Sequence, residues 1–291
     1  MNQFDSLKRS YGAFLQNEEH GGKYSGQIRQ ALEGGDYRVI VNVNDLRTAA
    51  NGETAYRGLM QAPRENLLAL QEAAAEIAKL DPTLEKVLKE KEIQVGVEGS
   101  FGSHSVSPRG LNSRLLNRMV EVEGIVVKCS SVRPKLMESV QYCEETKNYS
   151  IRKFRDATSM NIGIATRDDH ELMPTNATMP VVDDSGNPLE MEHGLSRYKD
   201  HQILVLQEMP EKSRVGQLPI SVEVILEHDL VDKCKPGDRI LCRGIFRALS
   251  AQTNGQTSGV FKTVVISNNI SIIGKEVGAV KLTATDVRNI R

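Results

Sequence analysis

The chain has few cysteines, and they stand apart from one another. No two of them form a C-x2-C pair; they are Cys129, Cys143, Cys234 and Cys242. A structural zinc site normally takes four Cys or His ligands in two closely spaced pairs, but the next histidines after Cys143, His170 and His193, are isolated. The residues therefore predict no metal site. Cys143, in the stretch SVQYCEETK, is interpreted as a small buried thiol.

Long apolar runs are also missing. No stretch approaches the roughly 18 apolar residues that a membrane helix requires, and the first residues hold no apolar segment of a secretory signal. Together with the scattered cysteines, this favours a reducing compartment, cytosol or nucleus, and predicts no membrane contact. The net charge is −1, so any contact with nucleic acid must come from a local basic patch.

Signatures of catalysis are missing as well. A phosphate-binding loop ends in Gly-Lys followed by Ser or Thr, but Gly274 and Lys275 are followed by Glu276. There is no G-x-S-x-G elbow, H-E-x-x-H pair or dinucleotide fingerprint. Asp200 and His201 open a predicted strand with no nucleophile specified beside them. We therefore predict no catalytic residue and no cofactor in this chain.

Residues 1–97 are predicted to form a helical bundle. The stretch PRENLLALQEAAAEIAKL, residues 63–80, carries one apolar stripe, a proline in its first turn and Glu65 near its start. These features are typical of an amphipathic helix. The stretch at 96–110, GVEGSFGSHSVSPRG, is rich in Gly and Ser, and its composition indicates a linker.

After the linker the pattern changes to short strands. Valines alternate with glutamates in RMVEVEGIVVKC, where Gly124 marks a bulge or sharp bend. In KPGDR, Pro236 and Gly237 suit the central positions of a type II turn. About five strands with an early bend predict a small closed OB-type barrel over residues 98–142 and 200–273. Residues 143–199 are too long and polar for a barrel loop and are interpreted as an insertion, so the fold class is α+β.

Three regions carry candidate binding residues. The end of the first barrel strand is cationic, at the place where OB barrels present their ligand face. The loop EMPEKSRVGQLP, residues 208–219, has the length of an interaction loop. A predicted hairpin, with an Asn254-Gly255 tip that suits a tight turn, carries further cations on its arms. The candidate DNA-contacting residues are Lys128, Arg133, Lys135, Arg243, Arg247 and Lys262.

Several stretches together resemble a known family. Among them are YRVIVNVNDLR, GVEGSFGSHSVSPR, VEVEGIVVKCSSVRPKL and LQEMPEKSRVGQLPISVEVILEHDLVDKCKPGDRI. They resemble the N-terminal half of the eukaryotic minichromosome maintenance (MCM) proteins, most closely the subunit-three branch, over about residues 36–273. The resemblance implies a helical subdomain, an OB fold and a zinc-ribbon-like insertion. It also implies an ATPase motor, toward which 274–291 would be a linker.

The resemblance implies a function too: a non-catalytic collar of a hexameric replicative DNA helicase, acting in DNA replication licensing in the nucleus after cytoplasmic synthesis. The expected partners are the other MCM subunits of a heterohexameric ring and single- or double-stranded DNA in its central channel. ATP and Mg²⁺ are expected only in the motor.

Site residues follow from the resemblance by position. EMPEKSRVGQLP corresponds to the loop that reports DNA and subunit state to the motor; its residues include Glu208, Pro210, Lys212, Arg214, Gly216 and Gln217. Residues 247–261 correspond to a hairpin that projects into the channel, but the tip AQTNGQT lacks the basic residues that family hairpins often carry. Family members that bind zinc carry two cysteine pairs in this insertion, whereas this chain has only Cys143 there. Such a loss of the ligands is usual in the subunit-three branch. The insertion is therefore expected to hold no metal, and to be held by Ile151, Phe154 and Leu172.

Two other classes of protein stay open at this point. A stand-alone OB protein that coats single-stranded DNA would use aromatic platforms on its barrel, whereas aromatic residues make up 4% of the chain and tryptophan is absent. A metal-dependent enzyme would bind stoichiometric zinc, for which the residues offer no complete set of ligands.

Overall fold

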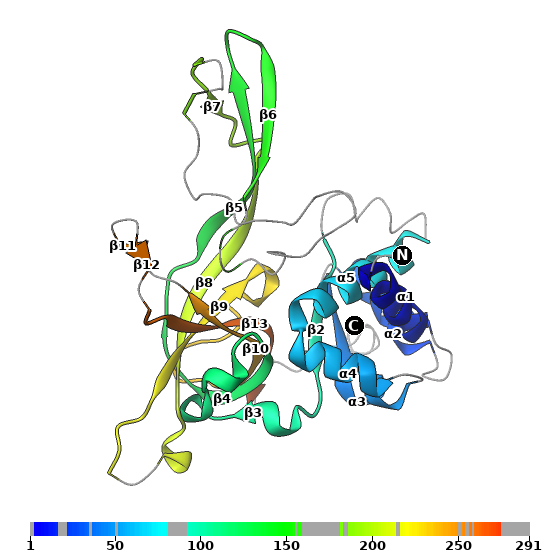
Figure 1. Ribbon diagram of the computed structural model, residues 1–291, viewed down its shortest axis with the longest axis vertical. Coiled ribbons are helices and arrows are strands. Elements are labelled where there is room, and N and C mark those ends of the chain that lie inside the picture. The colour runs from blue at the N-terminus through cyan, green and yellow to red at the C-terminus, as the bar shows by residue number, and fades with distance from the viewer. Residues whose placement is uncertain are drawn as a thin grey trace, which may run out of the picture.

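The computed structural model describes residues 3–16, 22–34, 37–49, 52–80, 92–154, 156, 158, 181–182, 186–213, 216–249, 252–253, 256–257 and 259–274. Figure 1 shows a helical part beside a β-barrel, with a long arm of strands rising from the barrel. Within these residues, no helix is both long and apolar enough to cross a membrane.

The helical part is built around one apolar core. Its helices are α1 (Gln3–Gln16), α2 (Lys23–Gly34), α3 (Val43–Thr48), α4 (Gly52–Gln61) and α5 (Pro63–Lys79). The helix predicted at 63–80 is confirmed as α5, with Pro63 in its first turn and Leu67, Leu70 and Ala74 buried. Two side chains from the barrel, Met119 and Ile245, complete this core, so the two parts share apolar packing.

The bundle contains a parallel strand pair that the helical prediction omitted. β1 (Arg38–Asn42) pairs with β2 (Gln94–Glu98) in parallel. The two strands are separated by about fifty residues, as expected because parallel strands need a long crossover connection. The helical prediction for 1–97 is therefore corrected to helices packed on a two-stranded sheet.

The linker predicted at 96–110 is wrong, because this stretch is packed structure. It begins inside β2, and Phe101 is 1% exposed. The short helix η2 (Gly102–His104) leads into β3 (Ser105–Val106), which pairs in parallel with the first barrel strand. A second short helix, η3 (Pro108–Gly110), packs near that strand. Composition alone suggested a linker, whereas the fold packs this stretch against the first barrel strand.

The predicted OB-type barrel is confirmed. Its strands are β4 (Met119–Cys129), β8 (Arg197–Gln207), β9 (Ser221–Glu227), β10 (Arg239–Leu249) and β13 (Lys262–Ile273). Hydrogen bonding runs in the order β4, β10, β13, β9, β8, and a further pairing of β8 with β4 closes the barrel. Alternate residues of β9, Val222, Val224 and Leu226, face its apolar core, as the period of two in a strand requires.

Glycine permits the close approach of neighbouring strands in the barrel. A Cβ at Gly124 would lie 2.5 Å from the carbonyl oxygen of Gln207, and one at Gly244 would lie 2.2 Å from that of Ile266. β4 pairs with β10 in regular register through Gly124 up to Ile125, and with β8 from Ile125 onward. Its register shift lies between Val126 and Lys128, so the irregularity predicted at Gly124 lies a few residues farther along the strand. The predicted type II turn is also present: the Asp238 N–H donates to the Lys235 carbonyl at 3.0 Å, and Gly237 has φ +95°.

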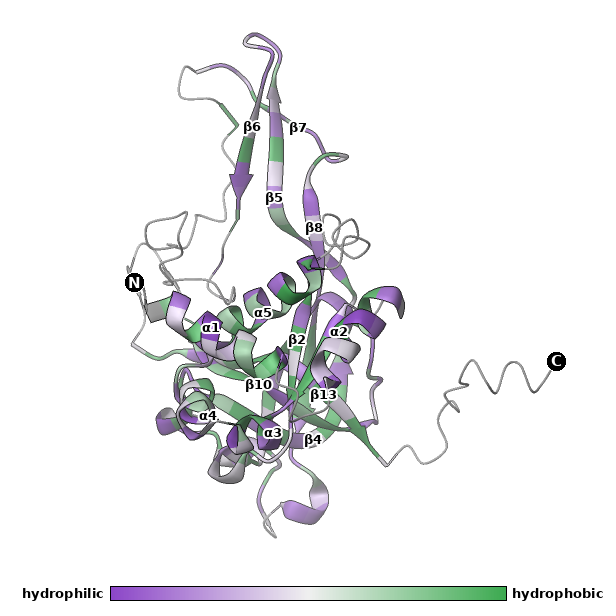
Figure 2. Cartoon of the chain, turned by 90° about the vertical axis from the view of Figure 1, so that its right-hand side faces the viewer, coloured by the Kyte–Doolittle hydropathy of each residue, from purple (hydrophilic) through white to green (hydrophobic). Residues whose placement is uncertain are grey.

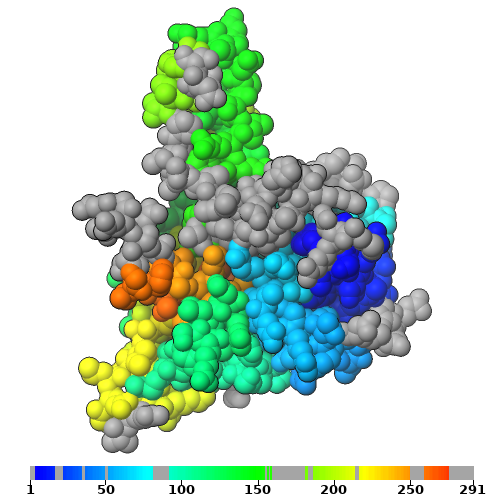
Figure 3. Space-filling view, viewed as in Figure 1, coloured from blue at the N-terminus to red at the C-terminus, as the bar shows by residue number. Residues whose placement is uncertain are grey.

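The arm is an extension of barrel strands. β5 (Arg133–Cys143) and β8 run out of the barrel side by side, and β6 (Asn148–Lys153) and β7 (Glu190–Met191) pair with the outer half of β5. Figures 2 and 3 show this arm as a narrow ladder that stands away from the body. Cys143, at the end of β5, is 2% exposed. Ile151 is 65% exposed, so its predicted role in holding the insertion is wrong; Leu172 lies outside the described residues.

Candidate nucleic-acid and subunit interface

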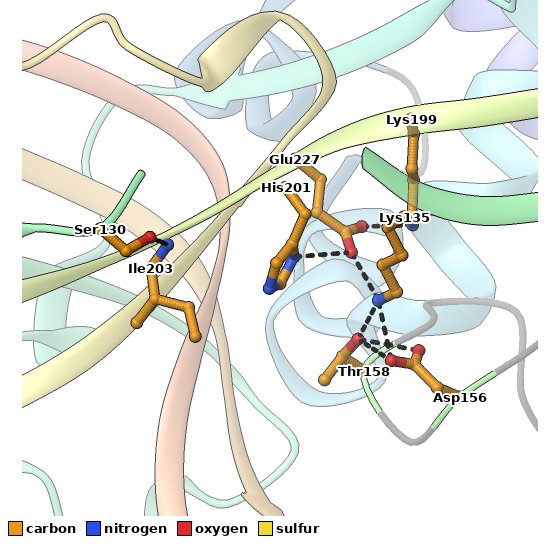
Figure 4. Close-up of polar contacts among 8 residues, drawn as sticks. All are labelled: Ser130, Lys135, Asp156, Thr158, Lys199, His201, Ile203 and Glu227. Atoms are coloured by element: carbon orange, nitrogen blue, oxygen red, sulfur yellow. Dashed lines mark hydrogen bonds and ion pairs between the residues drawn. The ribbon is translucent and has the colours of Figure 1, made fainter. Parts of the chain in front are cut away.

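Two of the predicted cations lie in the open at the turn between β4 and β5. Lys128 and Arg133 are exposed, and among the described residues neither has an acidic partner. Ser130 fixes the turn against β8: its N–H donates to the Ile203 carbonyl at 2.8 Å, and its hydroxyl accepts from the Ile203 N–H at 3.0 Å (Figure 4). Buried Gln202 donates its side-chain amide to the Ser130 carbonyl at 2.9 Å. The turn therefore presents two unneutralised charges on a braced backbone.

Lys135, the third cation of this region, is occupied within the protein. Its ammonium group lies 2.9 Å from Glu227, 2.8 Å from Asp156 and 2.7 Å from the Thr158 hydroxyl (Figure 4). The Lys135 side chain is 19% exposed. Two carboxylates already neutralise it, so its assignment as a DNA-contacting residue is corrected to a structural role at the root of the arm.

Glu227 is the acceptor at the centre of this cluster. Lys199 donates to it at 2.6 Å, whereas Nδ1 of His201 lies 3.8 Å away, beyond hydrogen-bond length. Burial by itself would raise the pKa of the Glu227 carboxyl, but the charges of Lys199 and Lys135 and their hydrogen bonds to it outweigh burial and hold the pKa well below its ordinary value. The carboxylate is therefore charged at neutral pH.

The cations on the two arms of the hairpin differ in their exposure to solvent. Arg243 is 5% exposed, and its guanidinium bonds to Glu121 and to the Ser271 hydroxyl, each at 2.8 Å. This burial removes Arg243 from the candidate DNA contacts, because phosphate has no access to it. Lys262 is 60% exposed but pairs with Glu223 at 2.6 Å.

Arg247 is half-buried on the other arm of the hairpin. Burial and the nearby charge of Arg64 lower the pKa of its guanidinium, while Asp156 acts in the opposite direction. The strands β11 (Gln252–Thr253) and β12 (Gln256–Thr257) pair beyond these arms, and the predicted Asn254-Gly255 tip lies outside the described residues. The described hairpin therefore offers Lys262 and, less openly, Arg247 to a ligand.

The loop between β8 and β9 is held by Arg109, a residue that the sequence patterns did not single out. The guanidinium of Arg109 bonds to Glu208 at 3.1 Å, to Gln217 at 2.8 Å and to the Leu218 carbonyl at 3.0 Å. The Glu208 side chain is 2% exposed. Arg109 stands in a Gly- and Ser-rich stretch without periodicity, so only the structure shows that it clamps both ends of this loop.

The other loop residues are spread over its surface. Pro210 and Lys212 lie on the short helix η5 (Pro210–Lys212), and Lys212 contacts Glu123 of β4. Gly216 has φ +78°, which favours glycine; Arg214 lies outside the described residues. Leu218, beside the clamp, is 89% exposed. The loop projects at the end of the molecule opposite to the arm (Figures 1 and 3).

The described residues offer no ligand set for a metal. No group of three or more His, Cys, Asp or Glu side chains within them is placed to hold an ion, and His170 lies outside them. Cys242 sits in the barrel core, where burial raises the pKa of its thiol to about 12. That the chain binds no zinc stays a prediction.

Comparisons with known proteins assign the chain to a family. A family model described as the MCM N-terminal domain matches residues 8–99, and one described as the MCM OB domain matches residues 106–250. These two matches cover the helical part and most of the barrel and arm. The chain belongs to the MCM family, so the predicted family is confirmed.

Individual relatives share the subunit-three name. The chain is 46% identical to the maternal DNA replication licensing factor mcm3 of Xenopus laevis, over 98% of this chain and 34% of the relative. It is 44% identical to the licensing factor Mcm3 of Drosophila melanogaster, over 93% and 31%, and 42% identical to MCM3 homolog 1 of Zea mays, over 98% and 35%. The predicted resemblance to the subunit-three branch is thus confirmed, and the chain spans about a third of the length of these relatives.

Proposed function

We propose that this chain is the non-catalytic N-terminal collar of a subunit of the replicative DNA helicase, acting in DNA replication licensing in the nucleus. The observation that carries the proposal is the match of the two MCM models to the helical part and to the barrel, together with relatives named as licensing factors. In this role the chain assembles with other MCM subunits into a heterohexameric ring, guides DNA through the channel and signals to an ATPase motor. ATP and Mg²⁺ belong to that motor.

DNA guidance rests on the exposed turn between β4 and β5. Lys128 and Arg133 supply positive charge that no described acidic group neutralises. Each phosphate contact to single-stranded DNA contributes a salt slope of about −0.7, so two contacts give about −1.4. Binding by one subunit is therefore weak and salt-sensitive, and useful affinity requires several subunits around one DNA molecule.

Signalling rests on the loop between β8 and β9. Arg109 fixes both ends of the loop, while Leu218 and Ile220, 89% and 40% exposed, present apolar surface beside the clamp. Exposed apolar side chains at the end of a braced loop suit contact with another protein surface. The loop residues Pro210, Lys212, Arg214, Gly216 and Gln217 thus form the proposed contact to a neighbouring subunit or motor, while buried Glu208 holds the loop through its pair with Arg109.

The alternative, a stand-alone protein that coats single strands, lacks support in the barrel. Its five strands, all described, contain two aromatic residues, Phe246 and Tyr198. Phe246 is 3% exposed, and Tyr198 lies at the arm end of β8. A coating protein needs aromatic side chains on which successive bases stack, and the barrel strands do not present such a series.

Fluorescence anisotropy with a labelled single-stranded oligonucleotide tests the DNA-guiding part. The doubly substituted Lys128→Gln/Arg133→Gln protein should bind more weakly and show a salt slope closer to zero by about 1.4 between about 50 and 200 mM salt. The matched control is Lys23→Gln/Arg57→Gln, which removes two exposed cations from the helical part. Tight, salt-insensitive binding by the unsubstituted chain, or equal losses in both variants, would contradict the proposal.

A further inference from the structure

The turn that ends β9 anchors two separate parts of the molecule. We propose that residues 227–229 mechanically couple the orientation of the helical part to that of the arm, so that displacing one shifts the other. Glu227 holds the arm and Asp229 holds the helical part, and only His228 separates them. Figure 1 shows the arm and the helical part leaving the barrel in different directions. This inference concerns the single chain and does not depend on the proposed function.

Asp229 binds the helical part through Arg38 of β1. The Arg38 guanidinium spans both carboxylate oxygens, at 2.7 and 2.5 Å, and also donates to the Asn268 carbonyl of β13. The Arg38 side chain is 8% exposed. Two parallel N–H···O bonds fix the plane of the guanidinium as well as its position. The direction of β1 is therefore tied to the position of Asp229.

The side chain of Asn268 strengthens the same attachment. Its amide donates to the Val95 carbonyl and accepts from the Val97 N–H, each at 2.8 Å. These bonds tie β2 to β13, next to the place where Arg38 binds. Both strands of the helical part are thus fixed to the barrel close to the 227–229 turn.

Glu227 binds the root of the arm on both of its strands. One carboxylate oxygen accepts from Lys135 of β5 at 2.9 Å and the other from Lys199 of β8 at 2.6 Å (Figure 4). Lys135 in turn contacts Asp156 and Thr158, which follow β6. The Lys135, Lys199 and Glu227 side chains are 19%, 11% and 12% exposed. Since Lys135 and Lys199 flank each other across the β5 and β8 pairing, moving Glu227 moves the base of the arm.

The turn between the two carboxylates is stiff. His228 has φ +57°, in the left-handed region, where a non-glycine residue stays only if its surroundings fix it. Leu230 is 1% exposed, and the Asp232 N–H donates to buried Gln202 at 3.0 Å. A turn that is anchored at both ends, and followed directly by buried and hydrogen-bonded residues, transmits a displacement instead of absorbing it. Because the turn is stiff, a movement at Asp229 is passed on to Glu227, and the reverse.

Hydrogen–deuterium exchange on the full chain tests the coupling. Asp229→Asn removes the charge that anchors the helical part and touches no residue of the arm. The proposal expects amide exchange in residues 139–153 to rise at least about fivefold, the lower end of typical coupling energies. Reciprocally, Glu227→Gln should raise exchange in 38–42 and 94–98. Arg38→Lys, which keeps the charge and loses the two-pronged geometry, gives a milder version if Asp229→Asn folds poorly.

Glu223→Gln is the matched control for these variants. Glu223 is also on β9 and also pairs with a lysine, Lys262, but this pair touches neither the arm nor the helical part. It should leave exchange in both regions unchanged. An Asp229→Asn or Arg38→Lys protein whose arm exchanges at the unsubstituted rate would overturn the coupling. A rise of equal size in the barrel strand 240–246 would also overturn it, since that result reports global opening.

Discussion

Replacing Arg109 by alanine removes the clamp on the loop between β8 and β9. Arg109→Ala leaves the Glu208 carboxylate, whose side chain is 2% exposed, without its guanidinium. Removing one partner of a buried ion pair costs about 3–5 kcal/mol. Because the Arg109 side chain itself is 25% exposed, we expect a loss near the lower end, about 3 kcal/mol in the free energy of unfolding.

Two further variants separate charge from geometry. Arg109→Lys keeps a cation beside Glu208 but cannot also reach Gln217 and the Leu218 carbonyl. The loss of two hydrogen bonds at about 1 kcal/mol each gives about 2 kcal/mol. In the double variant Arg109→Ala/Glu208→Gln the buried charge is gone, so part of the stability lost in Arg109→Ala should return.

Urea unfolding followed by circular dichroism measures these differences, with the slope m checked for constancy. Arg114→Ala is the control, since Arg114 is exposed on the nearby short helix η4 (Ser113–Leu115) and should change stability by less than about 0.5 kcal/mol. Exchange of the 208–220 amides should rise in Arg109→Ala and stay unchanged in Arg114→Ala. A loss in Arg109→Ala no larger than that in Arg114→Ala would refute the clamp.

Three further predictions follow from burial and backbone geometry. Gly244→Ala should destabilise the barrel by at least about 3 kcal/mol in urea unfolding, since its Cβ would meet the Ile266 carbonyl at 2.2 Å. Gly12→Ala, inside α1 with nothing within 4 Å of its Cβ, should stabilise the protein by about 1 kcal/mol. Equal effects of the two substitutions would contradict the packing at Gly244. Arg243→Ala should cost about 3–5 kcal/mol in the same assay and leave the DNA affinity of the folded protein unchanged; a stable protein with lost affinity would restore Arg243 as a DNA contact. Because the folded pKa of Glu227 lies below its ordinary 4.5, its contribution to stability is complete above that pH and is lost as the pH falls toward the folded pKa; Glu227→Gln should flatten this acid limb of the stability curve, and an unchanged limb would refute the account.

Features set by local chemistry were predictable from the sequence. The helix at 63–80 has its proline and apolar stripe within its own length, and the Lys235–Asp238 turn needs only Pro236 and Gly237. In each case the residues that decide the structure are neighbours in the chain.

Features set by distant residues were not predictable. Nothing near Arg243 distinguishes it from Lys262, yet the register of β10 against β4 places Arg243 opposite Glu121, more than one hundred residues away. Likewise, Lys135 and Lys128 stand seven residues apart in one cationic stretch, and only the approach of Glu227 separates a buried brace from an exposed cation. Pairing between strands therefore decided which candidate cations face solvent.

The parallel pair of β1 and β2 was missed by the sequence prediction for the same reason. Both strands are five residues long and lie among helical signals, so neither predicts its partner. The strand pattern and the resemblance to the MCM family both predicted the barrel, whereas the role of Arg109 required the three-dimensional contacts of η3 with the loop.

Native mass spectrometry of this chain, alone and mixed with the corresponding parts of other MCM subunits, tests the collar most directly. We expect specific mixed assemblies that build toward a six-membered ring. When Leu218 and Ile220 are both replaced by serine, the assemblies should contain fewer subunits. A chain that stays monomeric with every candidate neighbour, while binding single-stranded DNA tightly by itself, would contradict it.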